Sequence, residues 1–234
     1  MISVIVVAKG MWPVTKSFLD TLCETADEEI DLIYVENGSP DYASWNEANQ
    51  WGMRRSKPMK MYMFEEPVCL AKAWNTAFRM SVGERVLICN NDLIFHRHGW
   101  LQAFNMALDD GNVGVVGMTG MSWHNVPFIQ GSIFAFRRDM FYVGDEIGFD
   151  ERFEFTCEEV DFNLRVQQAG KNIVQLPYLR DDGYIEHLEG ATRNFYRDQT
   201  TNYQRLAHRS RLEFCYKWLD ELAARGNSEI TIND

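Results

Sequence analysis

The chain has 234 residues, 46% of them hydrophobic and 24% charged, with a formal net charge of −11, a composition typical of a globular protein large enough for one sizeable core. No run of residues approaches the roughly 20 apolar positions that a membrane-spanning helix needs. The negative charge argues against nucleic acid and anionic lipid as primary partners, because both would repel an acidic surface.

The amino terminus is typical of a first strand and not of a signal peptide. Residues 1–7 are mostly β-branched and lack both a basic start and a small-residue cleavage site. We therefore expect a cytoplasmic protein without a transmembrane anchor. The five cysteines are widely spaced, odd in number and without a Cys-x-x-Cys pair, which favours reduced, mostly buried thiols over disulfides or a zinc site.

The first half of the chain alternates between strand and helix patterns. In chain order we expect strands at 3–8, 31–36, 59–64 and 85–89, separated by helices at 14–23, 44–53 and 70–80. Gly83 has the position of a C-cap residue for the third helix. Strands that alternate with helices of about ten residues predict an α/β fold with a parallel, doubly wound sheet.

The second half is less regular. We expect helices at 98–109, 158–169 and 195–225, and strands at 113–117, 128–136 (interrupted by Gly131) and 172–176. Without repeats or a clear linker, residues 1–226 are interpreted as one domain, with a nucleotide-binding half at about 1–95, an acceptor half at about 96–226 and a polar tail at 227–234. The apolar residues of helix 195–225 fit packing against the domain, with a homodimer contact as the alternative.

Polar clusters at 36–39 and 90–92 fall at the carboxyl ends of two predicted strands, where ligands of parallel sheets bind. The carboxylate of Glu36 could accept a hydrogen bond from a base imide or a ribose hydroxyl. The alternative is a plain Asn-Gly turn. One ligand could contact both clusters.

The second of these clusters is Asn90-Asn91-Asp92. Magnesium and manganese prefer oxygen ligands and usually take one or two carboxylates, with phosphates and water completing the shell. On the triplet alone, the tendency of Asn and Asp to form turns after strands is the better explanation.

A third cluster, at 156–161, contains Glu158, Glu159 and Asp161 at the start of a predicted helix. One of these carboxylates could be a general base that deprotonates an acceptor hydroxyl. Thr156 and Glu159 also have the spacing of a capping box, and acidic residues suit the positive end of a helix. From the residues alone the base and the cap are equally supported.

His187 follows a predicted strand. A lone histidine is more often structural than a ligand, but Gly190, Thr192 and Arg193 nearby could meet a phosphate.

Several common nucleotide and nucleophile motifs are absent: the sequence has no Walker loop, no Gly-x-Gly-x-x-Gly and no serine nucleophile elbow. It does contain, in this order, Ser-Val-Ile-Val-Val, Val-Glu-Asn-Gly-Ser, Leu-Ala-Lys-Ala-Trp-Asn, Leu-Ile-Cys-Asn-Asn-Asp, Gly-Ser-Ile-Phe-Ala-Phe-Arg-Arg, Gly-Phe-Asp-Glu-Arg-Phe and Glu-Glu-Val-Asp-Phe-Asn-Leu-Arg, followed by His187. Over about residues 1–193 this series resembles the family-2 glycosyltransferases of the GT-A fold, especially their rhamnosyltransferase-like branch.

The resemblance implies roles for the matching positions. Contacts to the donor nucleotide are implied for Ala8, Lys9, Glu36, Asn37, Asn75, Asn91 and Arg193. Asp92 matches the last acid of the Asp-x-Asp metal motif, and His187 matches a histidine that contacts metal or diphosphate. Glu159 falls on the Asp of the Glu-Asp catalytic pair and would be the base. The acceptor side is assigned Gly131, Ser132 and Glu158.

Three departures from the family pattern are Glu36 for Asp, Asn90 for the first acid of Asp-x-Asp, and Glu159 for Asp, which lengthens the base by one methylene. The implied reaction is transfer of a sugar from a nucleoside-diphosphate sugar to an acceptor hydroxyl, with inversion and with Mn²⁺ or Mg²⁺. The acceptor expected from the family is a saccharide or glycolipid, with a protein or a modified nucleic-acid base as alternatives. An inactive sugar-nucleotide-binding module and a nucleotidyltransferase are the rival functions.

Overall fold

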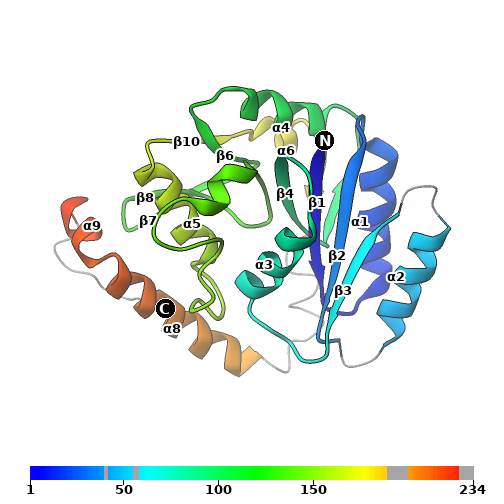
Figure 1. The fold of residues 1–234 in the computed structure, drawn as a ribbon, viewed down its shortest axis with the longest axis horizontal. Helices are drawn as coiled ribbons and strands as arrows, with labels where there is room; N and C mark the ends of the chain where they lie inside the picture. Colours follow the sequence, from blue (N-terminus) through cyan, green and yellow to red (C-terminus); the bar gives the residue numbers. More distant parts are fainter. Residues whose placement is uncertain (40–41, 55–57, 189–199, 227–234) are drawn as a thin grey trace.

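The computed structural model describes residues 1–39, 42–54, 58–188 and 200–226. A central twisted sheet is covered by helices on both faces, and two small sheets and two C-terminal helices flank it (Figure 1). The predicted fold class, an α/β fold with a mostly parallel central sheet, is confirmed.

The central sheet has seven strands in the order β10-β6-β9-β4-β1-β2-β3. Their bounds are β1 Ile2–Ala8, β2 Ile30–Asn37, β3 Lys60–Phe64, β4 Arg85–Asn90, β6 Val113–Gly117, β9 Ile133–Arg137 and β10 Asn172–Gln175. Strands β4, β1, β2 and β3 are parallel to one another, as are β6 and β10. Strand β9 is antiparallel to both of its neighbours, β4 and β6.

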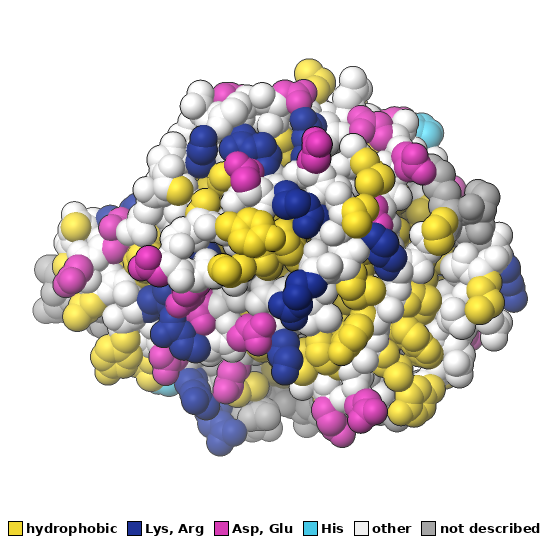
Figure 2. All heavy atoms as spheres, in the orientation of Figure 1, with side chains coloured by type: hydrophobic (Ala, Val, Ile, Leu, Met, Phe, Trp, Pro, Cys, Tyr) yellow, Lys and Arg dark blue, Asp and Glu magenta, His cyan; other side chains and the backbone are white. Residues whose placement is uncertain are grey.

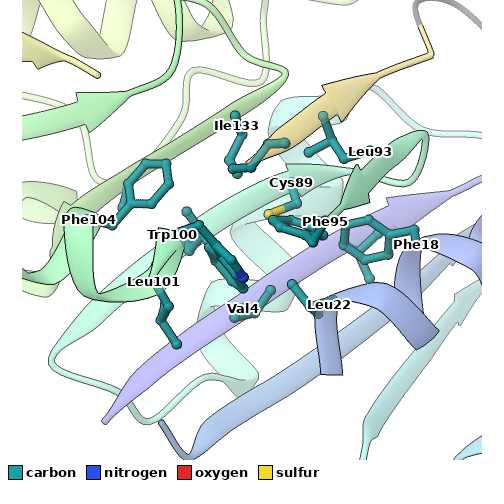
Figure 3. Close-up of a cluster of buried hydrophobic side chains, with 14 of the residues drawn as sticks. Val4, Phe18, Leu22, Cys89, Leu93, Phe95, Trp100, Leu101, Phe104 and Ile133 are labelled. Atoms are coloured by element: carbon teal, nitrogen blue, oxygen red, sulfur yellow. The ribbon is translucent and has the colours of Figure 1, made fainter. Parts of the chain in front are cut away.

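Two layers of helices bury the two faces of this sheet. The helices of the first half and centre are α1 Trp12–Thr25, α2 Ala43–Met53, α3 Leu70–Met80 and α4 Trp100–Asp109. Helices α1, α2 and α4 contribute to one core with the sheet, in which Phe18, Trp100 and Phe104 are fully buried (Figure 3). Helix α3 and helix α5 (Glu158–Gln168) form a second core on the opposite face. Strand β1 is apolar on both sides because it lies between these cores.

Smaller elements surround the second half of the sheet. They are β5 Leu93–Phe95 paired with β11 Ile185–His187, β7 Gly120–Trp123 paired with β8 Val126–Ile129, the 3₁₀ helix η1 Arg138–Tyr142, α6 Tyr178–Asp181, α8 Thr200–Lys217 and α9 Leu219–Ala224. A third core joins β8, α5, α8 and α9, with Phe214 and Leu222 fully buried in it. The predicted packing of the last long helix against the domain is therefore confirmed for Phe214, whereas Tyr216 and Leu219 are exposed.

Gly83 is not the C-cap of α3, so that prediction was wrong. The helix ends at Met80, and Ser81 follows in extended conformation with its hydroxyl bonded to the carbonyl of Phe78. Gly83 instead approaches strand β1, where its N–H donates to Ser3 Oγ at 2.8 Å. A Cβ on Gly83 would lie 2.6 Å from the Ser3 nitrogen, so the glycine is required by close backbone approach.

Charged side chains of both signs alternate on the face drawn in Figure 2, including the lower left where α8 passes. Among the described residues, no helix combines the length and apolar character that crossing a membrane requires. The five cysteines are free thiols, as predicted.

Candidate active site

The carboxyl ends of β1, β2 and β4 meet at one edge of the sheet. Ala8 is in register with Glu36, and Val7 with Asn90. The two polar clusters predicted to lie together are therefore neighbours across β1. This edge is the position at which parallel sheets of this kind bind ligands.

Glu36 is fully buried, and its carboxylate has partners on both oxygens. Oε1 accepts hydrogen bonds from the N–H of Gly10 at 2.8 Å and from the Ser39 hydroxyl, and Oε2 accepts one from the Tyr34 hydroxyl. The side chain thus ties the turn after β1 to the turn after β2. The predicted contact of this carboxylate with a nucleoside stays a prediction.

The three asparagines predicted to contact the donor also have protein partners. Asn37 makes two bonds to the backbone of Val68, each 2.9 Å long, and Asn91 donates to Thr15 Oγ1 at 2.9 Å. Asn75 bonds both the N–H and the carbonyl of Phe149. These amides hold loops around the edge. Of the other predicted donor contacts, Ala8 is buried, whereas Lys9 is half-exposed, with a pKa that burial lowers.

Asp92 and His187 meet beside this edge, although 95 positions separate them. Asp92 directly precedes β5, and His187 is the last residue of β11, opposite Leu93. The N–H of Leu188 donates to the carbonyl of Asp92 at 2.9 Å and fixes the register. His187 Nε2 lies 3.2 Å from Asp92 Oδ1.

The geometry of this pair fits two ligands of one cation. The buried Nε2 of His187 makes no hydrogen bond within the part of the chain that the structure describes. The 3.2 Å contact therefore brings together two atoms, His187 Nε2 and Asp92 Oδ1, that can each bind a metal ion. Two ligands about 2.1 Å from an ion, at adjacent corners of an octahedron, lie about 3.0 Å apart. A carboxylate with an imidazole suits manganese or magnesium when phosphate and water complete the shell.

The residues predicted on the acceptor side lie next to the same edge. The carbonyl of Ser132 accepts a hydrogen bond from Asn90 N–H at 2.8 Å, which joins the start of β9 to the end of β4. A Cβ built on Gly131 would lie 3.6 Å from the ring of Trp74 and 3.7 Å from the carboxyl carbon of Glu159. Gly131, Ser132 and Glu159 are thus brought together. Strand β9 makes this possible, since an antiparallel strand begins where its parallel neighbours end.

The start of α5 differs from the predicted capping box. The N-cap is Cys157, and Thr156 makes no side-chain cap bond. Instead, Glu158 Oε2 accepts the Thr156 N–H at 2.9 Å. Thr156 and Cys157 have φ angles of 106° and 73°, outside the conformation that a Thr N-cap adopts. The capping box of Thr156 and Glu159, one of the two interpretations left open by the sequence, is therefore not formed.

Glu159 Oε2 is buried and, among the described residues, has no hydrogen-bond partner. Burial raises the pKa of Glu159 above its ordinary value. Burial, with the adjacent charge of Glu159, raises the pKa of Glu158 as well. The pair therefore holds a proton more tightly than exposed carboxylates do, which suits proton transfer near neutral pH.

A second acidic cluster is already neutralised by one lysine and two arginines. One carboxylate oxygen each of Glu146, Asp150 and Asp161 lies within 4.8 Å of the others. The ammonium of Lys217 contacts all three, at 2.7, 2.9 and 2.7 Å. A cation would have to displace this ammonium, so we assign the cluster to an ion-pair network.

Sequence reasoning missed the partners that shape the site. Tyr34 lies two residues before Glu36 on the same face of β2, a spacing that could have indicated the contact. Thr15, Glu151 and Lys217 carry no comparable signal, because their partners are far away in the sequence. Arg193, also predicted for the site, lies outside the described residues.

The fold and the edge geometry define a GT-A type α/β domain. The sequence matches the family model described as glycosyl transferase family 2 over residues 3–127, which is 125 of 234 residues. The chain therefore belongs to glycosyl transferase family 2. No curated protein matches the sequence.

Solved structures support the same fold. The mannosyltransferase PcManGT from Pyrobaculum calidifontis, in complex with GDP-Man and Mn²⁺, has a TM-score of 0.65 at 20% identity over 75% of this chain and 54% of its own. S. aureus TarS 1–349 gives 0.63 at 17% identity over 99% and 73%. GalNAc-T7 with UDP, GalNAc and Mn²⁺ gives 0.66 at 11% identity over 76% and 42%. This chain thus spans about half the length of the mannosyltransferase, and at these identities the likeness concerns the fold.

Proposed function

We propose that this chain is a metal-dependent glycosyltransferase that moves a sugar from a nucleoside-diphosphate sugar to an acceptor hydroxyl, with inversion. The observation that carries this proposal is the convergence at one sheet edge of the Asp92–His187 pair and the buried carboxylate of Glu159. Family membership supports the reaction class.

On the donor side, Asp92 and His187 would hold a divalent cation. Such a cation supplies positive charge that stabilises the departing diphosphate. Lys9, at the end of β1, is the cationic side chain placed to contact a phosphate or the nucleotide. Glu36, which accepts the Gly10 N–H, would hold the backbone after β1 beside the nucleotide, and its contact with the nucleoside remains proposed. Arg193 remains a proposed second contact to the leaving phosphate.

On the acceptor side, Glu159 accepts the proton of the acceptor hydroxyl. The acceptor oxygen forms a bond to the anomeric carbon while the bond to the diphosphate breaks, and displacement from the opposite face inverts the configuration. Gly131 lies next to this base, and Gly131, Ser132 and Glu158 remain the proposed acceptor-side residues. The raised pKa of Glu159 makes it a stronger proton acceptor than an exposed carboxylate.

The ligands of the structural neighbours support this choice of donor and metal. The mannosyltransferase structure contains GDP-Man and Mn²⁺, and the GalNAc-T7 structure contains UDP, GalNAc and Mn²⁺. We propose Mn²⁺ or Mg²⁺ for this chain, a saccharide or glycolipid as acceptor, and a cytoplasmic location.

The test is thermal unfolding with UDP, GDP, ADP and dTDP, each with Mn²⁺, Mg²⁺ or a chelator. A ligand at about 100 times its Kd stabilises the native state by about 2.7 kcal/mol, and each kcal/mol is worth about 2–4 °C in a domain of this size. We expect a shift of about 5–10 °C with one nucleotide, lost with chelator and in Asp92→Asn and His187→Ala.

His208→Ala is the matched control for this experiment, because His208 is exposed on α8, which does not contribute to the proposed metal pair. It should shift as the wild type does. A wild type that no nucleotide stabilises, with or without metal, would contradict the proposed function. A shift that survives in both site variants would contradict the metal ligands only.

A further inference from the structure

The segment that leads to Glu159, residues 143–157, has little regular structure, and we call it the return segment. It follows η1 and runs back along α3. Asn75 bonds both backbone groups of Phe149, and Cys69 Sγ contacts the carbonyl of Glu151 at 3.7 Å. The guanidinium of Arg165 bonds the carbonyls of Val143 and Glu146. The position of the proposed base therefore depends on how this segment is held.

Helix α8 lies along the second half of the return segment (Figure 1). Ser210 Oγ accepts the N–H of Phe155 at 3.1 Å, and the rings of Phe214 and Phe153 lie 6.3 Å apart. The next contact along the helix is Lys217 with Asp150. The helix and the segment thus run in opposite directions with their contacts in register.

Lys217 is the point at which three parts of the chain meet. Its ammonium contacts Glu146 and Asp150 of the return segment, and Asp161 in the first turn of α5. Asp161 is fully buried and also accepts the indole N–H of Trp218 at 2.9 Å. Burial disfavours the charged lysine, but the carboxylates outweigh it and raise the pKa of Lys217 above its ordinary value, so the lysine stays cationic.

Two observations show that the start of α5 depends on outside contacts. Thr156 and Cys157 are consecutive non-glycine residues with positive φ, and such a backbone persists only where its surroundings determine it. The buried Oε2 of Glu159 makes no hydrogen bond to the described residues, and the hydrogen bond of its carboxyl is to its own backbone, so the carboxylate is held through α5 itself. Its orientation comes from the helix that carries it.

We propose that Lys217 is a positioning residue that locks the first turn of α5, and with it Glu159, against the return segment. The ammonium of Lys217 contacts both the return segment and α5, and α8 carries this lysine. Lys217 lies outside the region matched by the family model, which ends at residue 127. This assignment rests on the proposed function for its catalytic consequence.

The experiment compares Lys217→Met and Lys217→Arg with Lys16→Met, whose lysine is exposed on α1 and pairs with Asp20. Hydrogen exchange is followed over residues 150–163, where Phe155 N–H bonds to Ser210 and Asp161 N–H bonds to the carbonyl of Cys157. We expect exchange to accelerate at least tenfold there in Lys217→Met. Lys217→Arg should restore protection in part, and Lys16→Met should match the wild type.

The catalytic readout is release of nucleoside diphosphate from the sugar nucleotide whose nucleoside stabilises the protein. In Lys217→Met the rate at saturating donor should fall at least tenfold, while the Kd for Mn²⁺ with the nucleoside diphosphate stays within twofold. Glu146→Gln, which removes one of the three carboxylates, should give a smaller change in the same direction and replaces Lys217→Met if that variant does not fold.

Unchanged exchange over 150–163 would overturn the positioning role, as would equal losses of rate and nucleotide affinity. The exchange measurement needs no turnover, so it decides the role of Lys217 even if the wild type binds no nucleotide. That last result would contradict the proposed function alone.

Discussion

At the scale of single residues, Glu158 and Glu159 are neighbouring carboxylates with different contacts. Glu158 accepts the Thr156 N–H and supports the turn into α5. Glu159 points beside Gly131 and Trp74, and its buried oxygen has no bond to the described residues. One therefore supports the backbone, while the other is available to a ligand.

Substituting Glu159 by Gln tests the base directly, because Gln keeps the size of the side chain but cannot accept a proton. Loss of a general base costs about 10²–10⁴ in rate. We expect release of nucleoside diphosphate to fall by that factor, while the metal-dependent thermal shift with nucleotide persists. Retained turnover in Glu159→Gln would rule out this residue as the base.

Substituting Glu158 by Gln tests the buried carboxylate pair through stability. Burial, with the charge of Glu159, raises the pKa of Glu158 to about 8. A carboxyl with a raised pKa contributes stability that is present below its unfolded pKa, about 4.3, and is lost as pH rises through its folded pKa. Gln stays neutral and can still accept the Thr156 N–H.

Thermal unfolding of this variant should therefore match the wild type at about pH 4 and exceed it increasingly up to pH 8. Each kcal/mol of unfolding free energy that the variant gains over the wild type corresponds to about 2–4 °C in melting temperature. We therefore expect the melting temperature of Glu158→Gln to be a few degrees higher at pH 8. A difference that does not change with pH would mean that Glu158 ionises as an exposed carboxyl does.

At the scale of elements, β6 ends at a glycine that packing requires. A Cβ on Gly117 would lie 2.1 Å from Ile129 Cγ2 and 2.8 Å from the carbonyl of Ile133. Gly117→Ala should destabilise the protein by about 1–3 kcal/mol, as overpacked cores do. Gly111, just before the same strand, has no atom within 4 Å of its Cβ position.

Gly111→Ala is thus the matched control, and urea unfolding of both variants provides the measurement. If the two variants had equal midpoints, the contact between β6 and the 129–133 turn would not constrain the sheet.

At the same scale, most elements of the central sheet were predicted, including the short β10, whereas the three-residue strands were not. The expected strand 128–136 was wrong, because β8 and β9 are two strands in different sheets. Leu70–Met80 and Val113–Gly117 were predicted with their observed bounds. Strands β5 and β11 have three residues each, too few for a periodic signal. The pairing of Asp92 with His187 depends on these two strands, so the resemblance implied both residues but local sequence patterns could not show that they meet.

At the scale of the whole molecule, the order of motifs along the chain predicted the GT-A fold, and the strand pattern predicted that the polar clusters at 36–39 and 90–92 meet at one sheet edge. What could not be predicted is how distant residues use their polar groups. The contacts of Glu36 with Gly10 and of Asn75 with Phe149 are examples, since nothing in the local sequence indicates either partner. A buried polar group must find a partner, and which partner it finds depends on tertiary contacts that local pattern does not contain.

The net charge of −11 is distributed over a surface on which both signs alternate in the view of Figure 2. In the interior, the carboxylates of Glu146, Asp150 and Asp161 are offset by Lys217, Arg152 and Arg165. Overall charge therefore describes solubility and long-range repulsion better than it describes any one site.

The single reversed strand of the central sheet makes the two parts of the site separable. Strand β9 begins beside β4 and carries the chain to the far edge, so the return segment must cross the α3 face before Glu159 reaches the site. Asp92 and His187, the proposed metal ligands, reach the same place by another path, through β5 and β11. An insertion or deletion in residues 143–157 would therefore move the base relative to a fixed donor platform. Changes to the return segment could therefore adapt the proposed enzyme to larger or smaller acceptors without altering the proposed donor half.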